Sequence, residues 1–372
     1  MKWPSEAFKN SLQEITGFGL ENCIGANKCM EVCPVNRLGI DQKELDSVLV
    51  SGHWTDRVQT FVEECVQCGD CTLACPASVQ RDHMVLALKQ MLPEVPKPWR
   101  RYNALKGRQD RFWLIDLYNI AARVLYGRLG QYIDKTPLEQ NDLLFYFGCY
   151  VFSPSKAPEA TLKLADRIGL DYEVLAGLKS CCGWPQYLTG DMGYGQGMLQ
   201  YLDGLIQQAE PKTIVTGCAE CYVALLRLKK KTSAPWEVLT TPMWLLHHKD
   251  SLNWQKFPDP IGIHDSCHVS KKVGKPDPAR ELLDLMADRV ELYQTPEDCL
   301  CCGYYNIHIN DTLNRDLHQQ KLQHLAKAGG KAMAVECVTC WEAFDKSFTD
   351  ANIPLLEMMV AAEMATRSEG EA

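Results

Sequence analysis

The chain has 372 residues, a length that fits two or three domains rather than one average domain. Its 39 Lys and Arg residues against 47 Asp and Glu residues give a net charge of −8, which argues against a general nucleic-acid-binding surface. Hydrophobic residues at 46% and charged residues at 23% are ordinary for a packed protein, so disorder along the whole chain is excluded.

The unusual feature of the composition is its 18 cysteines. The first ten residues, MKWPSEAFKN, contain no apolar signal core, and no apolar run approaches the roughly 18 residues that a membrane helix requires. We therefore expect a cytoplasmic protein rather than an exported disulfide-bonded one. Clustered cysteines in a reducing compartment indicate metal binding.

The first seven cysteines fall into two runs with iron–sulfur spacing. Residues 65–76 read Cys-x2-Cys-x2-Cys-x3-Cys-Pro, in which the first three thiolates bind one cubane cluster and the fourth binds a neighbouring cluster. Residues 23–34 read Cys-x5-Cys-x3-Cys-Pro and supply the partner run. Sharing of cysteines between the runs predicts one [4Fe-4S] cubane, with the ligands Cys33, Cys65, Cys68 and Cys71.

The other cluster of this pair has only three cysteines, which are Cys23, Cys29 and Cys75. The position where a fourth is expected holds Ala26. We therefore predict a [3Fe-4S] cluster at this site, or a [4Fe-4S] cluster completed by water or by a group other than cysteine. A pair of zinc sites is the alternative, because four cysteines also suit Zn²⁺, but the two Cys-Pro signatures favour iron–sulfur clusters.

The segment between these two runs has helical patterns at residues 41–49 and 54–64. With Cys-x5-Cys-x3-Cys-Pro, it resembles the helical ferredoxin domains of succinate dehydrogenase iron–sulfur subunits, in which that motif lies beside a three-iron site. We expect a helical ferredoxin domain with two clusters at residues 1–95.

A basic and aromatic connector is expected at residues 96–140, with a helical apolar pattern at residues 114–129. Residues 97–128 have a local charge of +6, because they contain eight basic residues and only two acidic ones, Asp110 and Asp116. The basic residues are Lys97, Arg100, Arg101, Lys106, Arg108, Arg111, Arg123 and Arg128. Such a segment suits an anionic membrane surface or a partner subunit. A helix that packs between domains with its basic residues solvated is the alternative.

The region from Cys149 to Cys340 contains an internal repeat, because corresponding cysteines are 118 to 120 residues apart. In each unit, short apolar runs precede the cysteines and alternate with helical patterns. We predict an α+β multidomain protein in which two similar α/β domains, at 141–253 and 254–372, each contain a small parallel sheet. Because the carboxyl ends of parallel strands gather at one crevice, the cysteines of a unit should converge on one site.

Each unit supplies five cysteines, one more than a cubane or a tetrahedral zinc takes. The first unit has Cys149, Cys181, Cys182, Cys218 and Cys221, and the second has Cys267, Cys301, Cys302, Cys337 and Cys340. Adjacent cysteines cannot easily chelate one iron, but they can reach different metal atoms. Five ligands at one crevice therefore indicate an opened, non-cubane cluster with an accessible iron.

These motifs, with Gly148-Cys149, Cys181-Cys182-Gly183, Cys301-Cys302-Gly303 and two Cys-x-x-Cys pairs, resemble the CCG domains of heterodisulfide reductase catalytic subunits. Preceded by a two-cluster ferredoxin domain, the layout resembles the D subunit, which is equivalent to the C and B subunits fused. The resemblance implies that each set of five cysteines holds a non-cubane [4Fe-4S] cluster. It further implies that a disulfide binds between the two clusters and receives one electron from each.

The ferredoxin region contains no substrate motif, so we expect a protein partner that donates or accepts electrons: a flavoprotein, a ferredoxin-like protein or a membrane cytochrome. The expected substrate is a small-molecule or protein disulfide or thiol. The alternative function is that of an electron-transfer subunit in a flavoprotein dehydrogenase complex, since iron–sulfur subunits of glycolate, lactate and anaerobic glycerol-3-phosphate oxidation have similar layouts. A zinc-stabilised scaffold without redox chemistry is a third interpretation.

Several single residues have less specific interpretations. Cys299 has no equivalent in the first unit and is expected to be a packed or spare thiol. His264 and His268 flank Cys267 and are expected to hydrogen-bond a thiolate or a loop carbonyl rather than bind metal. The glycines of residues 192–198, MGYGQGM, do not follow a predicted strand, so we predict a loop or tight helix packing there and no flavin or NAD site.

Overall fold

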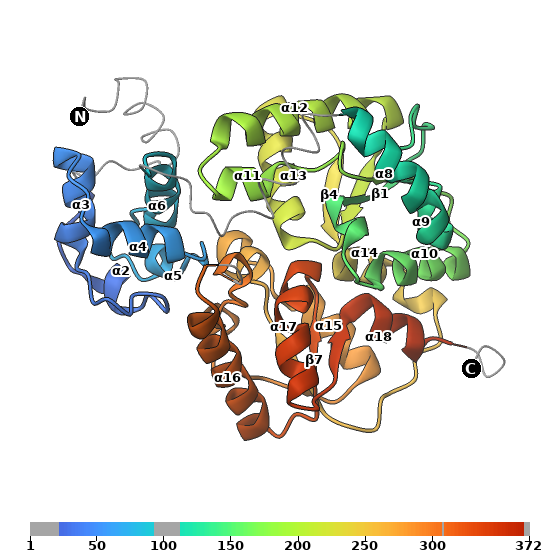
Figure 1. The fold of residues 1–372 in the computed structure, drawn as a ribbon. Helices are drawn as coiled ribbons and strands as arrows, with labels where there is room; N and C mark the ends of the chain where they lie inside the picture. The colour runs from blue at the N-terminus through green and yellow to red at the C-terminus, as the bar shows by residue number, and fades with distance from the viewer. Residues whose placement is uncertain (1–21, 93–111, 307–308, 368–372) are drawn as a thin grey trace.

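The computed structural model describes residues 22–92, 112–306 and 309–367 of the chain (Figure 1). In residues 22–92 all regular elements are helical: α2 (Lys28–Glu31), α3 (Gln42–Ser51), α4 (Asp56–Glu64), α5 (Asp70–Leu73) and α6 (Arg81–Gln90). Two N-caps define the longer helices. The Asp41 carboxylate accepts the Glu44 N–H at 2.7 Å, and the Thr55 hydroxyl accepts the Val58 N–H at 3.2 Å. The predicted helical N-terminal domain is confirmed.

The helical connector segment is present as α8 (Phe112–Leu125) and α9 (Gly127–Gly130). One side of α8 is apolar and faces solvent, with Leu117 59%, Ile120 65% and Val124 81% exposed. Arg128 is not a free surface cation, because its guanidinium pairs with Asp166. The predicted basic residues from 97 to 111 lie outside the described residues.

The first α/β domain follows, and its parallel four-stranded sheet has the order β2-β1-β3-β4. Its elements are β1 (Leu143–Gly148), η3 (Cys149–Phe152), α10 (Ala157–Ile168), β2 (Glu173–Ala176), α11 (Trp184–Leu188), α12 (Met192–Ala209), β3 (Thr213–Thr216), α13 (Ala219–Thr232), β4 (Glu237–Thr240), α14 (Thr241–His247) and η4 (Lys249–Ser251). The strands are buried on both faces, which is typical of parallel sheets with helices on both sides.

The second α/β domain repeats this topology with the strand order β6-β5-β7-β8, again all parallel. Its elements are β5 (Ile261–His264), η5 (His268–Val273), α15 (Asp277–Met286), β6 (Arg289–Val290), η6 (Pro296–Asp298), η7 (Tyr304–Asn306), α16 (Asp311–Ala328), β7 (Ala332–Val335), α17 (Val338–Asp350), β8 (Leu355–Glu357) and α18 (Met358–Ala365). The predicted pair of small parallel sheets is confirmed. The fourth strand of each sheet, β4 or β8, was not expected from the cysteine pattern because it ends at no cysteine.

The N-terminal helical domain lies beside the second α/β domain (Figure 1). Lys272 on the π-helix η5 pairs with Asp82 on α6 over 3.0 Å, and both side chains are largely buried. The Asn306 side-chain amide donates to the backbone oxygen of Glu64 at 2.8 Å. The end of the cysteine-rich helical domain is thereby fixed against the loops that carry cysteines in the second repeat.

Candidate metal centres

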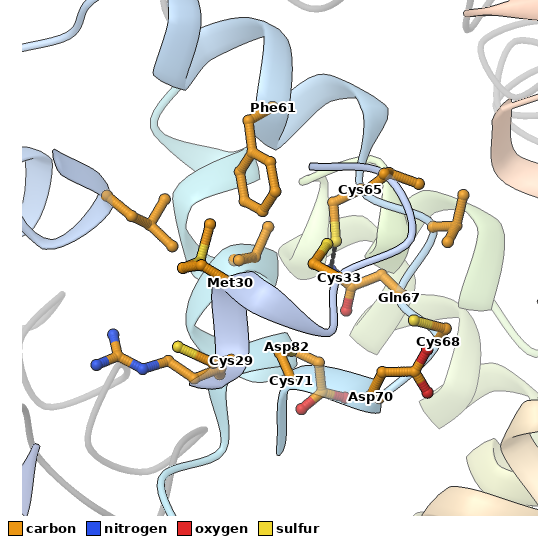
Figure 2. A pocket seen from close by; sticks show the side chains of 16 residues that line it. Cys29, Met30, Cys33, Phe61, Cys65, Gln67, Cys68, Asp70, Cys71 and Asp82 are labelled. Atoms are coloured by element: carbon orange, nitrogen blue, oxygen red, sulfur yellow. Dashed lines mark hydrogen bonds between the residues drawn. The ribbon is translucent and has the colours of Figure 1, made fainter. Parts of the chain in front are cut away.

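Five cysteines of the N-terminal domain line one small cavity of about 20 Å³, and its exposed wall is almost entirely apolar. Figure 2 shows Cys33, Cys65, Cys68 and Cys71 around it, together with Cys29. The first four are the set predicted to hold the cubane, and Cys33 comes from a different run than the other three. Burial raises the pKa of the Cys33 thiol to about 12, and neighbouring Cys65 adds to this effect.

Short helices place these cysteines. Helix α2 begins after Asn27 and helix α5 begins after Gly69, and both preceding residues have a left-handed backbone, with φ of 56° and 91°. Gly69 suits this conformation because it has no Cβ. The tight turns let the two four-residue helices contact one another, so Cys29 and Cys71, which are 42 residues apart in the sequence, line the same cavity.

The three cysteines predicted for the second N-terminal site also interact with one another: Cys23, Cys29 and Cys75. The guanidinium of Arg81, only 2% exposed, donates to the Cys23 sulfur at 2.9 Å and pairs with Asp46. Ala26 is exposed, as a position without a ligand would be. The group next to these three thiols is therefore the buried ion pair of Arg81 and Asp46 rather than a fourth cysteine.

The first repeat brings its cysteines together at the carboxyl ends of β1 and β3. Cys181 donates to the Cys149 sulfur at 3.4 Å, and Cys221 donates to the Cys182 sulfur at 3.5 Å. Cys218, the N-cap of α13, hydrogen-bonds with Cys221. The predicted convergence of five cysteines on one site is what the geometry shows for this unit.

The second repeat has the same pattern of contacts. Cys267 hydrogen-bonds with Cys301, and Cys340 hydrogen-bonds with Cys302 and with Cys337, the N-cap of α17. In both repeats the second cysteine of the adjacent pair has a lowered pKa. Hydrogen bonds from Cys301 and Cys340 cause this shift at Cys302, and the equivalent thiols cause it at Cys182.

The glycine after each adjacent pair is required by its backbone and by its surroundings. Gly183 and Gly303 have φ of 74° and 72°. A Cβ on Gly183 would lie 2.4 Å from the backbone oxygen of Gly195, and one on Gly303 would lie 2.1 Å from the Asn314 side chain. Gly195 belongs to the MGYGQGM segment, which forms the start of α12 and packs closely there, as predicted.

The two repeats meet at their Cys-x-x-Cys motifs. Cys218 and Cys337 interact electrostatically across the domain boundary. The Ala219 N–H also donates to the Cys337 sulfur at 3.3 Å, and the Val338 N–H donates to the Gly217 oxygen at 3.2 Å. Both cysteines sit at helix N-termini, whose partial positive charge favours the thiolate.

The residues with less specific predictions occupy the second domain. His268 lies with Nδ1 3.5 Å from the Cys267 sulfur and packs edge-on against Trp184 of the first domain, with ring centroids 5.8 Å apart. His264 is buried against Phe344, and neither of its ring nitrogens has a hydrogen-bond partner among the described residues. The hydrogen bond expected of His264 is therefore not made there.

Cys299, the unmatched cysteine, is 1% exposed and lies with its sulfur 3.7 Å from the hydroxyl of Ser270. The Lys271 ammonium donates to its backbone oxygen at 2.6 Å and pairs with Asp70 of the N-terminal domain. The geometry is that of a packed thiol, and its freedom from metal stays a prediction.

Sequence reasoning missed several charged residues that are buried or largely buried around these cysteines, among them Glu220, Lys271, Lys272 and Lys321. Burial raises the pKa of Glu220, which lies inside the first Cys-x-x-Cys, to about 8. The consecutive lysines four and five residues after Cys267 were the available signal for Lys271 and Lys272. Nothing in the local pattern marks Lys321, which reaches the site only through the fold.

The donor set fits iron–sulfur clusters. All 18 cysteines are free thiols, and each repeat gathers five of them with no other metal-binding side chain among the predicted ligands. Within the described residues, no group of three or more His, Cys, Asp or Glu side chains is placed to hold a single metal ion. Iron–sulfur clusters contain several metal atoms, so different thiols of one site can bind different iron atoms.

In the part of the chain that the structure describes, no helix has the length and apolar character needed to cross a membrane.

Comparison with protein families gives two matches. Residues 22–79 match the 4Fe-4S dicluster domain, and residues 143–226 and 261–345 each match the cysteine-rich domain called CCG. No curated protein matches the chain. A solved structure of glutamate racemase from Francisella tularensis subsp. tularensis SCHU S4, in complex with D-glutamate, is 12% identical, covers 60% of this chain and 79% of its own, and has a TM-score of 0.30.

The matched ranges coincide with the two cysteine runs of the helical domain and with the two five-cysteine units of the repeat. The protein thus joins a 4Fe-4S dicluster ferredoxin domain to two cysteine-rich CCG domains, an organisation that supports iron–sulfur electron transfer.

Proposed function

We propose that this protein is an iron–sulfur oxidoreductase that reduces a disulfide to two thiols with electrons delivered through its ferredoxin domain. The balance is one disulfide, two electrons and two protons for two thiols. In this proposal the ligands of the N-terminal cubane are Cys33, Cys65, Cys68 and Cys71, and those of the three-cysteine cluster are Cys23, Cys29 and Cys75. The ten cysteines of the two repeats hold two non-cubane clusters, which when bound supply one electron each.

The observation that carries the proposal is the contact between the two five-cysteine sites, where the N–H of Ala219, next to Cys218, donates to the Cys337 sulfur at 3.3 Å. A disulfide has two sulfur atoms close together, so its reduction by two one-electron donors requires two complete sites that face a common space. Each repeat has all five of its cysteines, and the two motifs that meet are the Cys-x-x-Cys motifs at corresponding positions of the two repeats. A chain in which one site only relayed electrons would not need a second complete set.

The exposure of the ten cysteines supports an entrance at the first site. Nine of them are buried, and Cys149, at the end of β1, is the one with intermediate exposure. Buried thiol ligands keep water away from the reacting sulfur atoms, while an accessible edge admits a substrate.

The position of the ferredoxin domain supports electron entry through the second CCG domain. Cys68 interacts electrostatically with Cys301 and with Lys271, and Lys271 pairs with Asp70 and donates to the Cys299 oxygen. The ligands assigned to the cubane are thus neighbours of the ligands assigned to the second non-cubane cluster. A short separation is what one-electron transfer between clusters requires.

A protein must supply the electrons, since the ferredoxin domain contains no substrate motif. The exposed apolar side of α8, with Leu117, Ile120 and Val124, agrees with the predicted contact of this segment with a partner or a membrane surface. Which of these covers it stays a prediction, as does the cytoplasmic location.

The test uses anaerobically purified protein and electron paramagnetic resonance (EPR). Addition of 2-mercaptoethanol or a panel of larger thiols to the mildly oxidised protein should produce a paramagnetic signal that is absent without thiol. Cys182→Ser and Cys302→Ser should abolish it, whereas Cys299→Ser, at the unassigned cysteine, should leave it intact.

The protein could contain its full complement of iron and sulfide and yet show no spectral change with any thiol or disulfide. That result would refute the proposal that a disulfide is reduced at these sites. Reduction of such a protein by a flavoprotein would then assign it as the electron-transfer subunit of a dehydrogenase complex.

A further inference from the structure

Lys321, on helix α16 of the second CCG domain, is a fully buried ammonium without a hydrogen-bond partner. Its side chain is 0% exposed, and no acceptor for Nζ occurs among the described residues. The face of the Tyr293 ring lies against this ammonium, with its centroid 4.4 Å from Nζ. An unpaired buried charge is costly, so the fold must provide a compensating negative charge nearby.

The groups that surround Lys321 identify where that charge can come from. They are Cys299, Asp265 and Cys340, which attract it, and Lys271, which repels it, with the buried His264 and His318 and the part-buried His324 also close. Asp265 is already engaged by Arg280, whose guanidinium donates to it at 2.8 Å. Burial lowers the pKa of Lys321 to about 8, and the neighbouring Cys299, Asp265 and Cys340 oppose this shift because they favour the charged ammonium. The free negative charge on this side is that of the metal-ligating thiolates, which include Cys340.

Among the described residues of the first CCG domain, no lysine or arginine is buried. Helices α12 and α16 both have 18 residues and end at equivalent alanines, Ala209 and Ala328. With this alignment Lys321 corresponds to Leu202, and both side chains are 0% exposed. The two repeats therefore share their cysteines but differ in a buried charge at one equivalent position.

We propose that Lys321 is the counter-cation of the second cysteine site and that it holds this site at a higher reduction potential than the first. The inference rests on the proposed function only in that both cysteine sets hold clusters. Each one-electron reduction adds one negative charge to a site, and a fixed ammonium stabilises the reduced form. The second site, which adjoins the ferredoxin domain, is then reduced before the first.

The effect should be large enough to measure. One unit charge at a separation of several ångströms, in a buried region, changes a one-electron equilibrium about tenfold, which corresponds to about 59 mV. Lys321→Met preserves most of the side-chain volume and removes the charge. Lys321→Arg keeps the charge. Lys327→Met removes an exposed cation from the same helix, and Leu202→Met changes the equivalent position of the first domain.

The experiment is an EPR-monitored redox titration of the anaerobic full-length protein. In the wild type the two CCG signals should have different potentials, and the higher one should be the signal that Cys302→Ser removes. In Lys321→Met that signal should shift to lower potential by about the stated amount, while the other CCG signal and the ferredoxin signals stay in place. Lys321→Arg, Lys327→Met and Leu202→Met should titrate like the wild type.

Equal wild-type potentials, a higher potential for the signal that Cys182→Ser removes, or an unchanged titration of Lys321→Met would each overturn the inference. Should Lys321→Met fail to fold, the wild-type order of potentials and the Cys302→Ser assignment still decide it. Absence of iron and sulfide from the wild type would instead refute the proposed function, so the two failures are distinguishable.

Discussion

The sulfur of Cys337 accepts a hydrogen bond from the backbone N–H of Ala219, with an N–S distance of 3.3 Å. The two residues belong to different CCG domains, and Ala219 is the first helical residue after Cys218. The helix N-terminus of one repeat thus contacts a predicted metal ligand of the other. Because of this hydrogen bond, a change of charge at Cys337 acts directly on the first domain. The two sites are therefore coupled more strongly than they would be by a shared cavity alone.

Replacement of the second cysteine in either adjacent pair should damage one CCG site only. Cys182→Ser and Cys302→Ser each remove a thiol that has two hydrogen-bond partners. One partner is the preceding cysteine of the adjacent pair, and the other is the second cysteine of the Cys-x-x-Cys motif. Each variant should lose about one cluster's iron, measured by iron and sulfide analysis, and should keep the ferredoxin signals in EPR. Survival of disulfide turnover in both variants would contradict the two-site proposal.

Ala26→Cys should convert the three-cysteine site into a four-cysteine site. Ala26 is exposed and lies between Cys23 and Cys29, so a thiol there meets no packed neighbour. EPR of the oxidised protein should show loss of a three-iron signal and gain of a four-iron signal on reduction. A wild type that already shows only four-iron signals at this site would mean that a ligand other than cysteine completes it.

Cluster removal should unfold the ferredoxin domain before the CCG domains. Residues 22–92 form a small domain of short helices, and metal binding supplies much of the folding free energy in such small domains. Hydrogen exchange after anaerobic iron chelation should show loss of amide protection in α3, α4 and α6. Strands β1, β3, β5 and β7 should retain theirs, and uniform loss across all elements would contradict this order.

Lys272→Met should destabilise the contact between the ferredoxin domain and the second CCG domain. It leaves Asp82, with a 5% exposed side chain, as an unpaired buried carboxylate, a change that typically costs about 3–5 kcal/mol. Urea unfolding of the holoprotein gives the measurement. Lys256→Met is the matched control, since its pair with Asp288 is exposed at both ends and should contribute less than about 1 kcal/mol. Equal effects of the two changes would show that the interface pair is not structural.

Local spacing was sufficient to predict the parts of the fold that repeat. The 118- to 120-residue offset between equivalent cysteines predicted two domains, and apolar runs ending at Cys149 and Cys218 predicted parallel strands, which the structure contains. The helical ferredoxin domain followed from the patterns around residues 41–64.

The buried charges around the sites could not be predicted in this way. Lys321 lies in a helix whose other charged residues face solvent, and only the packing of α16 against Tyr293 shows that its ammonium is buried. Likewise, the pairing of Lys272 with Asp82 joins residues 190 positions apart, so no periodicity connects them. The packing of the ferredoxin domain against the second repeat depends on such pairs.

The central claim is that thiolates of this chain hold iron and sulfide at four places. Mössbauer spectroscopy of anaerobically purified, iron-57-labelled protein, combined with iron and sulfide analysis, tests it most directly. Four clusters should give roughly 15 to 16 iron atoms per chain with a similar amount of sulfide, and at least two iron environments that differ from a regular cubane. Bound zinc with no sulfide, or iron sufficient only for the N-terminal pair, would contradict it.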